Sequence, residues 1–321
     1  MYLKDFIDEI SILLNSENKE LIEVDLMLHK IVSELSQNNF LFENLLLKGG
    51  TCLIKNYLGY YRFSEDLDFT WKDQNIIKNK SGKQLRRDLS ELINKVAETF
   101  EIICAKINLD FVADKRNKHY FEFGGSNKMV TFYLYFNLET QDNMERSIQI
   151  QINFAECLKF ESKIEKLKSV LPRNSELNLN FPTKYKEYSK EITFPMYSIK
   201  EILCEKVRAI ITRRVVEGVN IKGRDFFDIY FILKEYKFKI EELKNQIIEK
   251  TLFAINQYDK YRENLRERME LINSDVPLTW NWEHEKSLLL KKLDEDNFSK
   301  FLAEFNIFLE RIIEEIYEKI A

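Results

Sequence analysis

Glycine, proline, cysteine and histidine are all scarce in this chain of 321 residues, with 8 Gly, 4 Pro, 4 Cys and 3 His. So little glycine and proline argues against long disordered linkers, which are enriched in both. The cysteines are scattered among apolar residues without a CxxC pair, which predicts buried free thiols. The histidines lack HxxxH spacing, which argues against a zinc site.

Long apolar runs and a strong charge of either sign are also missing. No apolar run approaches the ~18 residues of a membrane span, and the N-terminal segment carries acids early without a signal-peptide pattern. We therefore expect a cytoplasmic protein without membrane contact. The net charge of −4 argues mildly against a protein that coats nucleic acid, but it leaves room for a local basic groove.

The residues that are present make an ordinary globular composition with many large rings. Hydrophobic residues make up 45% and charged residues 32%, and the chain has 24 Phe and 15 Tyr. This bulk is enough for sizeable cores. The length favours two domains.

Helix and strand signals share the first two thirds of the chain. Apolar spacing predicts amphipathic helices over residues 4–14, 20–37 and 82–104. Alternation predicts a strand from Asp66 onward and strands over 120–123, 130–138 and 148–154. The last three should pair antiparallel because their connections are short. Residues 160–197 read as irregular, with one short strand at 191–194.

From Ser198 onward the pattern is helical almost to the end. Ser198 and Glu201 predict a capping box at the start of this region. Residues 276–278 predict a break, and residues 297–320 predict an amphipathic tail helix. We therefore expect an α+β domain over residues 1–195 and a helical domain over residues 196–321.

Two short motifs carry the chemistry of the first domain. Asp66 and Asp68 are two apart on a predicted strand, so both carboxylates face one side, about 7 Å apart at Cα. Such charges repel unless a cation lies between them, and Mg²⁺ binds one or two carboxylates plus substrate phosphates. Gly49 and Gly50 offer backbone N–H groups to a phosphate, and Thr51 is placed to cap a helix running to residue 57.

Each motif alone is common by chance, and a bare DxD more often marks the solvent face of an edge strand. Their combination predicts a metal-plus-phosphate site. A second cluster lies in the helical half, where Lys206 and Arg213 are seven apart and Asp225 and Asp228 are three apart. Each pair shares a helix face, although ordinary solvated charge explains such spacing equally well.

Four segments together resemble a known family. Residues 47–51 (LKGGT), 62–69 (RFSEDLDF), 205–209 (EKVRA) and 224–230 (RDFFDIY) are similar to motifs of the AbiEii/AbiGii nucleotidyltransferase toxins. The resemblance covers roughly residues 20 to 235. It implies a nucleotidyltransferase-like mixed sheet flanked by helices, related to the DNA polymerase β superfamily. It also implies an appended C-terminal helical bundle that contributes to the active-site cleft.

The resemblance also implies roles for particular residues. Asp66 and Asp68 would bind Mg²⁺, with Mn²⁺ as an alternative ion, and Lys206 and Asp225 would complete the catalytic set. The NTP would be held by a larger group of residues. That group is Lys48, Gly49, Gly50, Thr51, Ser64, Lys206 and Arg213.

One position departs from the family pattern. The superfamily usually places a third carboxylate on a later strand, but residues 148–153 read IQIQIN. Gln149, Gln151 and Asn153 share a face and offer only neutral oxygen, and Glu156 lies just past the strand, out of phase. A two-metal mechanism needs enough anionic oxygen for both ions. Either Asp225 supplies the missing charge, or the metal site is weak, or the acceptor is activated differently.

The resulting hypothesis is a toxin of a toxin–antitoxin or abortive-infection pair. It would move a nucleoside monophosphate from an NTP to an acceptor hydroxyl, and the resemblance points to a tRNA 3′ end and a cognate antitoxin. A nucleotidyltransferase acting on a protein or small molecule is one alternative. The other is a catalytically silent nucleotide-binding module that holds a partner.

Overall fold

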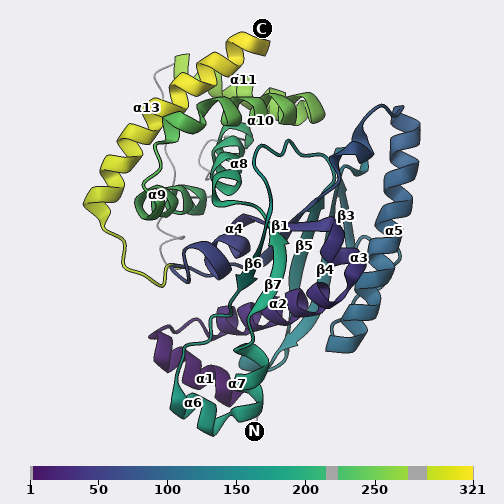
Figure 1. Ribbon diagram of the computed structural model, residues 1–321, viewed down its shortest axis with the longest axis vertical. Coiled ribbons are helices and arrows are strands. Elements are labelled where there is room, and N and C mark those ends of the chain that lie inside the picture. The colour runs from purple at the N-terminus through teal and green to yellow at the C-terminus, as the bar shows by residue number, and fades with distance from the viewer. Residues whose placement is uncertain (1–2, 215–222, 274–287, 321) are drawn as a thin grey trace. The chain divides into compact units, whose positions relative to one another are not determined.

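The computed structural model describes residues 3–214, 223–273 and 288–320. The chain divides into two compact units. Figure 1 labels the helices and strands and colours them by residue number. The sheet unit comprises Met1–Ala155 and Ser162–Tyr197, and the helical unit comprises Glu156–Glu161 and Ser198–Ala321. The sheet is mixed and its flanking elements are helices, so the predicted α+β class with C-terminal helices is confirmed.

One seven-stranded sheet organises the sheet unit, in the order β3-β4-β5-β2-β1-β7-β6. The strands are β1 (Leu45–Lys48), β2 (Asp66–Trp71), β3 (Phe121–Gly124), β4 (Met129–Leu138), β5 (Met144–Asn153), β6 (Lys163–Leu167) and β7 (Ile192–Met196). β2 pairs in parallel with β5, as β1 does with β7, and the other neighbours are antiparallel. β2 therefore lies in the middle of the sheet, with three strands on each side.

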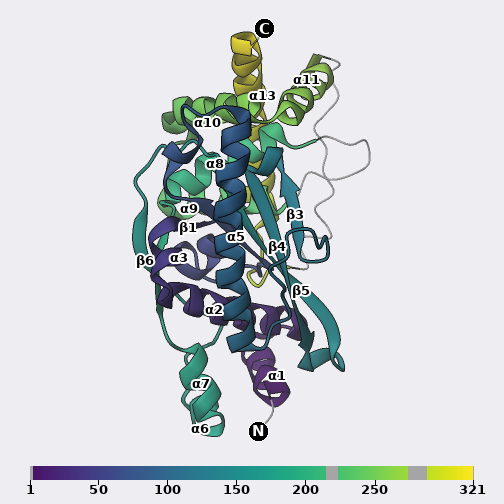
Figure 2. The same cartoon turned by 90° about the vertical axis from the view of Figure 1, so that its right-hand side faces the viewer.

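Two long helices cover one face of the sheet. They are α2 (Lys19–Gln37) and α5 (Gly82–Ile107), and Figure 2 shows α5 lying along the strands. The Phe100 ring of α5 meets the Phe132 ring of β4 with centroids 4.9 Å apart. Ser81 caps the start of α5 by accepting from the Gln84 N–H, and Asn108 ends it in the left-handed conformation.

Shorter helices complete the sheet unit. They are α1 (Leu3–Leu14), α3 (Asn39–Asn44), α4 (Gly49–Cys52), the π-helix η1 (Leu53–Tyr57), η2 (Gln74–Ile77), η3 (Gly125–Asn127), η4 (Glu139–Gln141), α6 (Ser175–Asn180) and α7 (Pro182–Tyr188). α1 packs on the last two through Phe6, whose ring lies 5.4 Å from Phe181 and 6.2 Å from Tyr188.

Most elements of the sheet unit follow the sequence pattern. The three predicted helices are found, and the three predicted strands β3, β4 and β5 pair antiparallel. The short strand predicted at residues 191–194 is found as β7, but the expectation of otherwise irregular structure over residues 160–197 is wrong, since β6, α6 and α7 also lie there. β6 reads KIEKL and is an edge strand with exposed charges, so its sequence resembles a loop.

The helical unit contains α8 (Ile199–Thr212), α9 (Arg224–Tyr236), η5 (Ile240–Leu243), α10 (Lys244–Gln257), α11 (Asp259–Asn273) and α13 (Glu295–Ile320). The predicted tail helix is α13, and its rings form a core with α9. Phe298 lies 4.9 Å from Phe227, and Phe305 lies 5.8 Å from Phe226. The break predicted at residues 276–278 lies outside the described residues.

The capping box predicted at the start of α8 is half right. Ser198 Oγ accepts from the Glu201 N–H at 3.3 Å, but the Glu201 carboxylate is used elsewhere. It accepts from the backbone N–H groups of Lys159 and Phe160 and from Lys250 Nζ, at 2.9, 2.7 and 2.5 Å. In the parts of the chain that the structure describes, no helix combines the length and apolarity needed to cross a bilayer.

Candidate active site

The two aspartates lie on the central strand. Leu67 and Phe69 are completely buried, whereas Asp66 and Asp68 are partly exposed. Because side chains alternate along a strand, both carboxylates lie on one face, here called the aspartate face. Neighbours on both sides of β2 hold the strand in register, so the spacing of the two carboxylates is set by the sheet.

The glycine pair follows β1 directly. Gly49 begins α4 with φ +71°, a conformation that favours glycine. A Cβ built at Gly49 would overlap Oδ2 of Asp68, and one at Gly50 would lie 2.5 Å from Nη2 of Arg62. The absence of side chains therefore lets the start of α4 approach the Asp68 carboxylate closely.

Thr51 is not the helix cap that the sequence suggested. The helix begins two residues earlier, and Thr51 lies inside it with 1% exposure. Its hydroxyl bonds to Ser64 Oγ at 2.9 Å and to the Asp66 carbonyl at 2.5 Å. Thr51 and Ser64 thus tie α4 to the start of β2, and η1 continues the helix to Tyr57 as predicted.

The strand register gathers side chains into rows across the aspartate face. One row crosses five strands through Lys48, Asp68, Gln151, Thr131 and Glu122. In it, neutral Gln151 is the partner of Asp68 across the β2–β5 pairing. Among the described residues, no group of three or more His, Cys, Asp or Glu side chains is arranged to hold a metal.

Glu156 does not fill this gap, because it serves the helical unit. It is 5% exposed, and its Oε1 lies 3.5 Å from Nζ of Lys250, which also meets Glu201. Burial alone lowers the pKa of Lys250, but Glu156, Glu201 and Glu205 together raise it above its usual value. The first acid after β5 is therefore part of a buried ion pair.

The predicted residues of the helical unit form a compact charged cluster. Lys206 Nζ of α8 lies 3.0 Å from Asp225 Oδ1 and is also paired with Asp228 Oδ2. Arg213, at the C-terminal end of α8, is paired with Asp225 Oδ2. Lys206 and both aspartates are at most 9% exposed. This lysine is thus held between two carboxylates of α9.

Arg268 of α11 joins this cluster and was missed from the sequence. It is completely buried, and its Nη2 donates to the Arg213 carbonyl at 3.1 Å. Burial and then the charge of Arg213 lower its pKa to about 10. Asn264 and Leu265 are also buried one turn earlier on the same side of α11, but the polar sequence of this helix does not indicate that burial.

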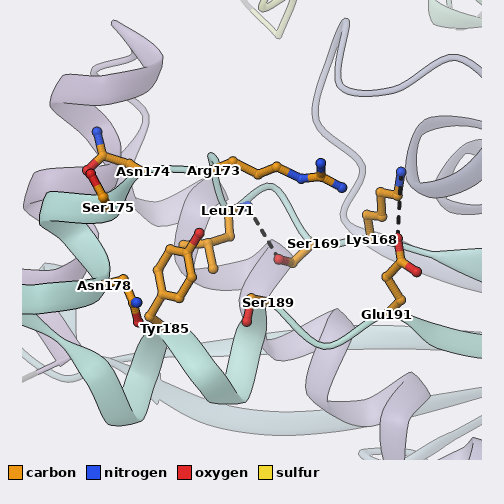
Figure 3. Close-up of a pocket in the computed structure, with 10 residues that line it drawn as sticks. All are labelled: Lys168, Ser169, Leu171, Arg173, Asn174, Ser175, Asn178, Tyr185, Ser189 and Glu191. Carbon is orange, nitrogen blue, oxygen red and sulfur yellow. Dashed lines mark hydrogen bonds and ion pairs between the residues drawn. The ribbon is translucent and has the colours of Figure 1, made fainter.

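A cavity of about 450 Å³ lies elsewhere in the sheet unit, lined by α6, α7, the segment that follows β6 and the segment that precedes β7 (Figure 3). Lys168, Arg173, Tyr185 and Glu191 are among its lining residues, and Lys168 lies 3.8 Å from Glu191. None of the predicted site residues lines it.

The family comparison agrees with the sequence motifs. The sequence model of the nucleotidyl transferase AbiEii toxin family, a type IV toxin–antitoxin system, matches residues 31–314. No curated protein matches the chain. One similar solved structure is MenT4, a nucleotidyltransferase toxin from Mycobacterium tuberculosis H37Rv. It is 21% identical with a TM-score of 0.45, over 78% of this chain and 71% of that one. Because the family match spans most of its length, this chain belongs to the AbiEii family and is a nucleotidyltransferase toxin of a type IV toxin–antitoxin system.

Proposed function

We propose that this toxin transfers a nucleoside monophosphate from an NTP to an acceptor hydroxyl, releasing pyrophosphate, with Mg²⁺ bound by Asp66 and Asp68. The approach of Gly49 to the Asp68 carboxylate carries the proposal. It brings the start of α4 close to the Asp68 carboxylate, which shares a face with that of Asp66, an arrangement that suits a phosphate bridged to a cation.

The donor set fits one divalent ion. Asp66 and Asp68 supply two carboxylates, and substrate phosphates and water fill the remaining positions that Mg²⁺ prefers. When bound, the ion would neutralise the triphosphate and lower the pKa of the acceptor hydroxyl. Mn²⁺ has the same preference for oxygen ligands and is the alternative ion.

The other predicted residues have supporting roles in this proposal. Lys48 and the N–H groups of Gly49 and Gly50 hold the phosphates, while Thr51 and Ser64 fix α4 to β2. In the helical unit, Lys206 and Arg213 supply positive charge of the kind that offsets a phosphate. Asp225 orients both of these cations, to which it is paired.

The acceptor and the setting complete the proposal. We assign the acceptor to the 3′ end of a tRNA, the location to the cytoplasm and the control of activity to a cognate antitoxin protein. The family match supports the antitoxin, and the resemblance of the motifs supports the RNA. The experiment below also detects transfer of label to a protein or a small molecule instead of RNA.

Incubation of the purified chain with each labelled NTP, Mg²⁺ and total tRNA tests the proposal. Label should enter tRNA for the wild type and not for Asp66→Asn, which alters a partly exposed carboxylate and should keep its fold. Circular dichroism checks folding. Label in protein instead would reassign the acceptor, and transfer by folded Asp66→Asn at the wild-type rate would refute the metal assignment.

A further inference from the structure

Aromatic side chains accompany the aspartates on the same face of the sheet. In the β2–β5–β4 register, Asp66 is the partner of Gln149, and Gln149 is the partner of Tyr133. Tyr133 and Tyr135 are two apart on β4, so they lie on this face together, opposite the side where Phe132 meets α5. The Cα atoms of Asp66 and Tyr133 are two strand spacings apart, about 10 Å.

The tyrosines are held by polar contacts at their far ends. Tyr133 donates its hydroxyl hydrogen to Glu122 Oε2 at 2.5 Å. Glu122 lies on β3, at the end of the row of side chains that contains Asp68. Tyr135 donates to the His119 carbonyl at 3.0 Å. The hydrogen bond of Tyr133 to Glu122, followed by burial and the charges of Glu122 and other groups including Asp66, raises the pKa of Tyr133 to about 12. Both rings are therefore neutral and fixed in position.

His119 extends the aromatic surface away from the aspartates. Its ring stacks on Tyr135 with centroids 4.1 Å apart and planes inclined by 6°. His119 is exposed, and it follows three exposed cations, Lys115, Arg116 and Lys118. Asp114 pairs with Arg116, so the segment keeps a net positive charge.

We propose that Tyr133, Tyr135 and His119 form a stacking platform for the single-stranded end of an RNA acceptor. Unpaired bases stack on aromatic side chains without regard to sequence, while cations nearby meet the phosphates. Tyr133, Gln149 and Asp66 are neighbours on adjacent strands, so an RNA end stacked on the platform would extend past Gln149 towards Asp66, where its terminal hydroxyl would react. This inference rests on the proposed function for its acceptor, but the platform is a separate site with a separate readout.

Binding of labelled tRNA, measured by fluorescence anisotropy at fixed salt, tests the platform without turnover. His119→Ala and Tyr133→Ala should each weaken binding roughly tenfold, a typical loss for one stacked base. His119→Phe and Tyr133→Phe keep the rings and should retain most of the affinity. Tyr185→Ala on α7 removes a ring of similar exposure outside the sheet and should bind as the wild type does.

A tRNA trimmed of its single-stranded 3′ end locates the contact. Trimming the tRNA should lower its affinity for the wild type. It should lower the affinity of His119→Ala only a little further, because that variant has already lost the same interaction. Binding of Mg²⁺–NTP, followed by thermal shift, should be the same in His119→Ala as in the wild type.

The outcomes separate the two proposals. If the wild type transfers nothing to tRNA but the alanine variants still lose end-dependent binding, the platform stands and the proposed acceptor reaction fails. If the wild type transfers label to tRNA while His119→Ala and Tyr133→Ala keep wild-type affinity and KM for tRNA, the platform is overturned. Absence of tRNA binding by the wild type overturns it as well.

Discussion

Gln151 is the partner of Asp68 where β5 runs parallel to β2, so the backbones of these two residues are one strand spacing apart, about 4.8 Å. An amide offers one neutral oxygen where a carboxylate would offer a charge. The two aspartates of β2 therefore face any bound cation with little anionic help from the part of β5 paired with β2, whose residues in the same phase are Gln149, Gln151 and Asn153.

Gln151→Asp should strengthen the response to Mg²⁺. The added carboxylate repels Asp68 across the strands, so without metal the variant should be less stable by about 0.5–1 kcal/mol. Saturating Mg²⁺ should restore its melting temperature, and the Mg²⁺ concentration for half-maximal transfer should fall by about tenfold. Gln151→Asn is the neutral control. Equal Mg²⁺ responses in Gln151→Asp and the wild type would show that no ion reaches this position.

Gly49→Ala should abolish transfer, whereas Gly59→Ala should not. Both glycines have positive φ, +71° and +68°, so each alanine costs a similar strain of about 1–2 kcal/mol. Only at Gly49 does the new Cβ meet Asp68, because nothing lies within 4 Å of a Cβ at Gly59. Urea unfolding measures the backbone strain that both variants share. A transfer assay measures the difference in activity between them. Similar activity in the two variants would contradict the importance of this approach.

Lys206→Ala should destabilise the helical unit by about 3–5 kcal/mol. The substitution leaves Asp228, which is completely buried, and Asp225 without the ammonium between them. Unfolding in urea, followed by circular dichroism, measures the loss. The double variant Lys206→Met with Asp228→Asn should lose less than the sum of its parts, since it removes both partners of one pair. A strictly additive loss would argue that Lys206 acts mainly outside this cluster.

His29 should make the sheet unit sensitive to mild acid. Burial, followed by the charge of Lys55, lowers the pKa of His29 to about 4, and Asp25 and the Lys190 carbonyl oppose this only partly. The folded pKa lies below the unfolded value of about 6.5, so the unfolded state binds more protons between them. The free energy of unfolding is therefore not reduced by His29 above pH 6.5, and it falls as the pH drops towards 4. At pH 5 the loss is about 2 kcal/mol.

Comparison with a variant isolates this histidine from the other titrating groups. His29 Nε2 lies 2.9 Å from the Lys190 carbonyl, and His29→Gln offers an amide N–H in its place. The free energy of unfolding, measured in urea at pH 7.5 and pH 5, should fall less in His29→Gln by about 2 kcal/mol. Equal pH dependence of the two proteins would mean that His29 is not kept neutral by the fold.

The parts of the site set by local pattern were predictable from the sequence. The alternation of acid and apolar residues placed β2, because Leu67 and Phe69 must be buried while Asp66 and Asp68 remain accessible. The start of α4 was misplaced at Thr51. A helix that begins directly after a strand, through a left-handed glycine, leaves no polar capping residue to recognise.

Buried charge was the main feature that the sequence concealed. Charged side chains are normally exposed, so Lys250 and Arg268 read as ordinary surface of a helical region, and Glu201 as a capping residue. In the structure all three are at most 1% exposed. Their burial depends on partners from distant segments, such as Glu156 for Lys250, and spacing along one helix carries no information about such pairs.

The short segment Glu156–Glu161 limits how this protein could be recombined. The chain passes between the two units three times, after residues 155, 161 and 197. A chimera joined once at residue 198 would take Lys250 and Glu201 from one parent and Glu156, Lys159 and Phe160 from the other. Exchange of the helical unit between relatives would therefore need two exchanged pieces, so the two units should be inherited together and diverge together.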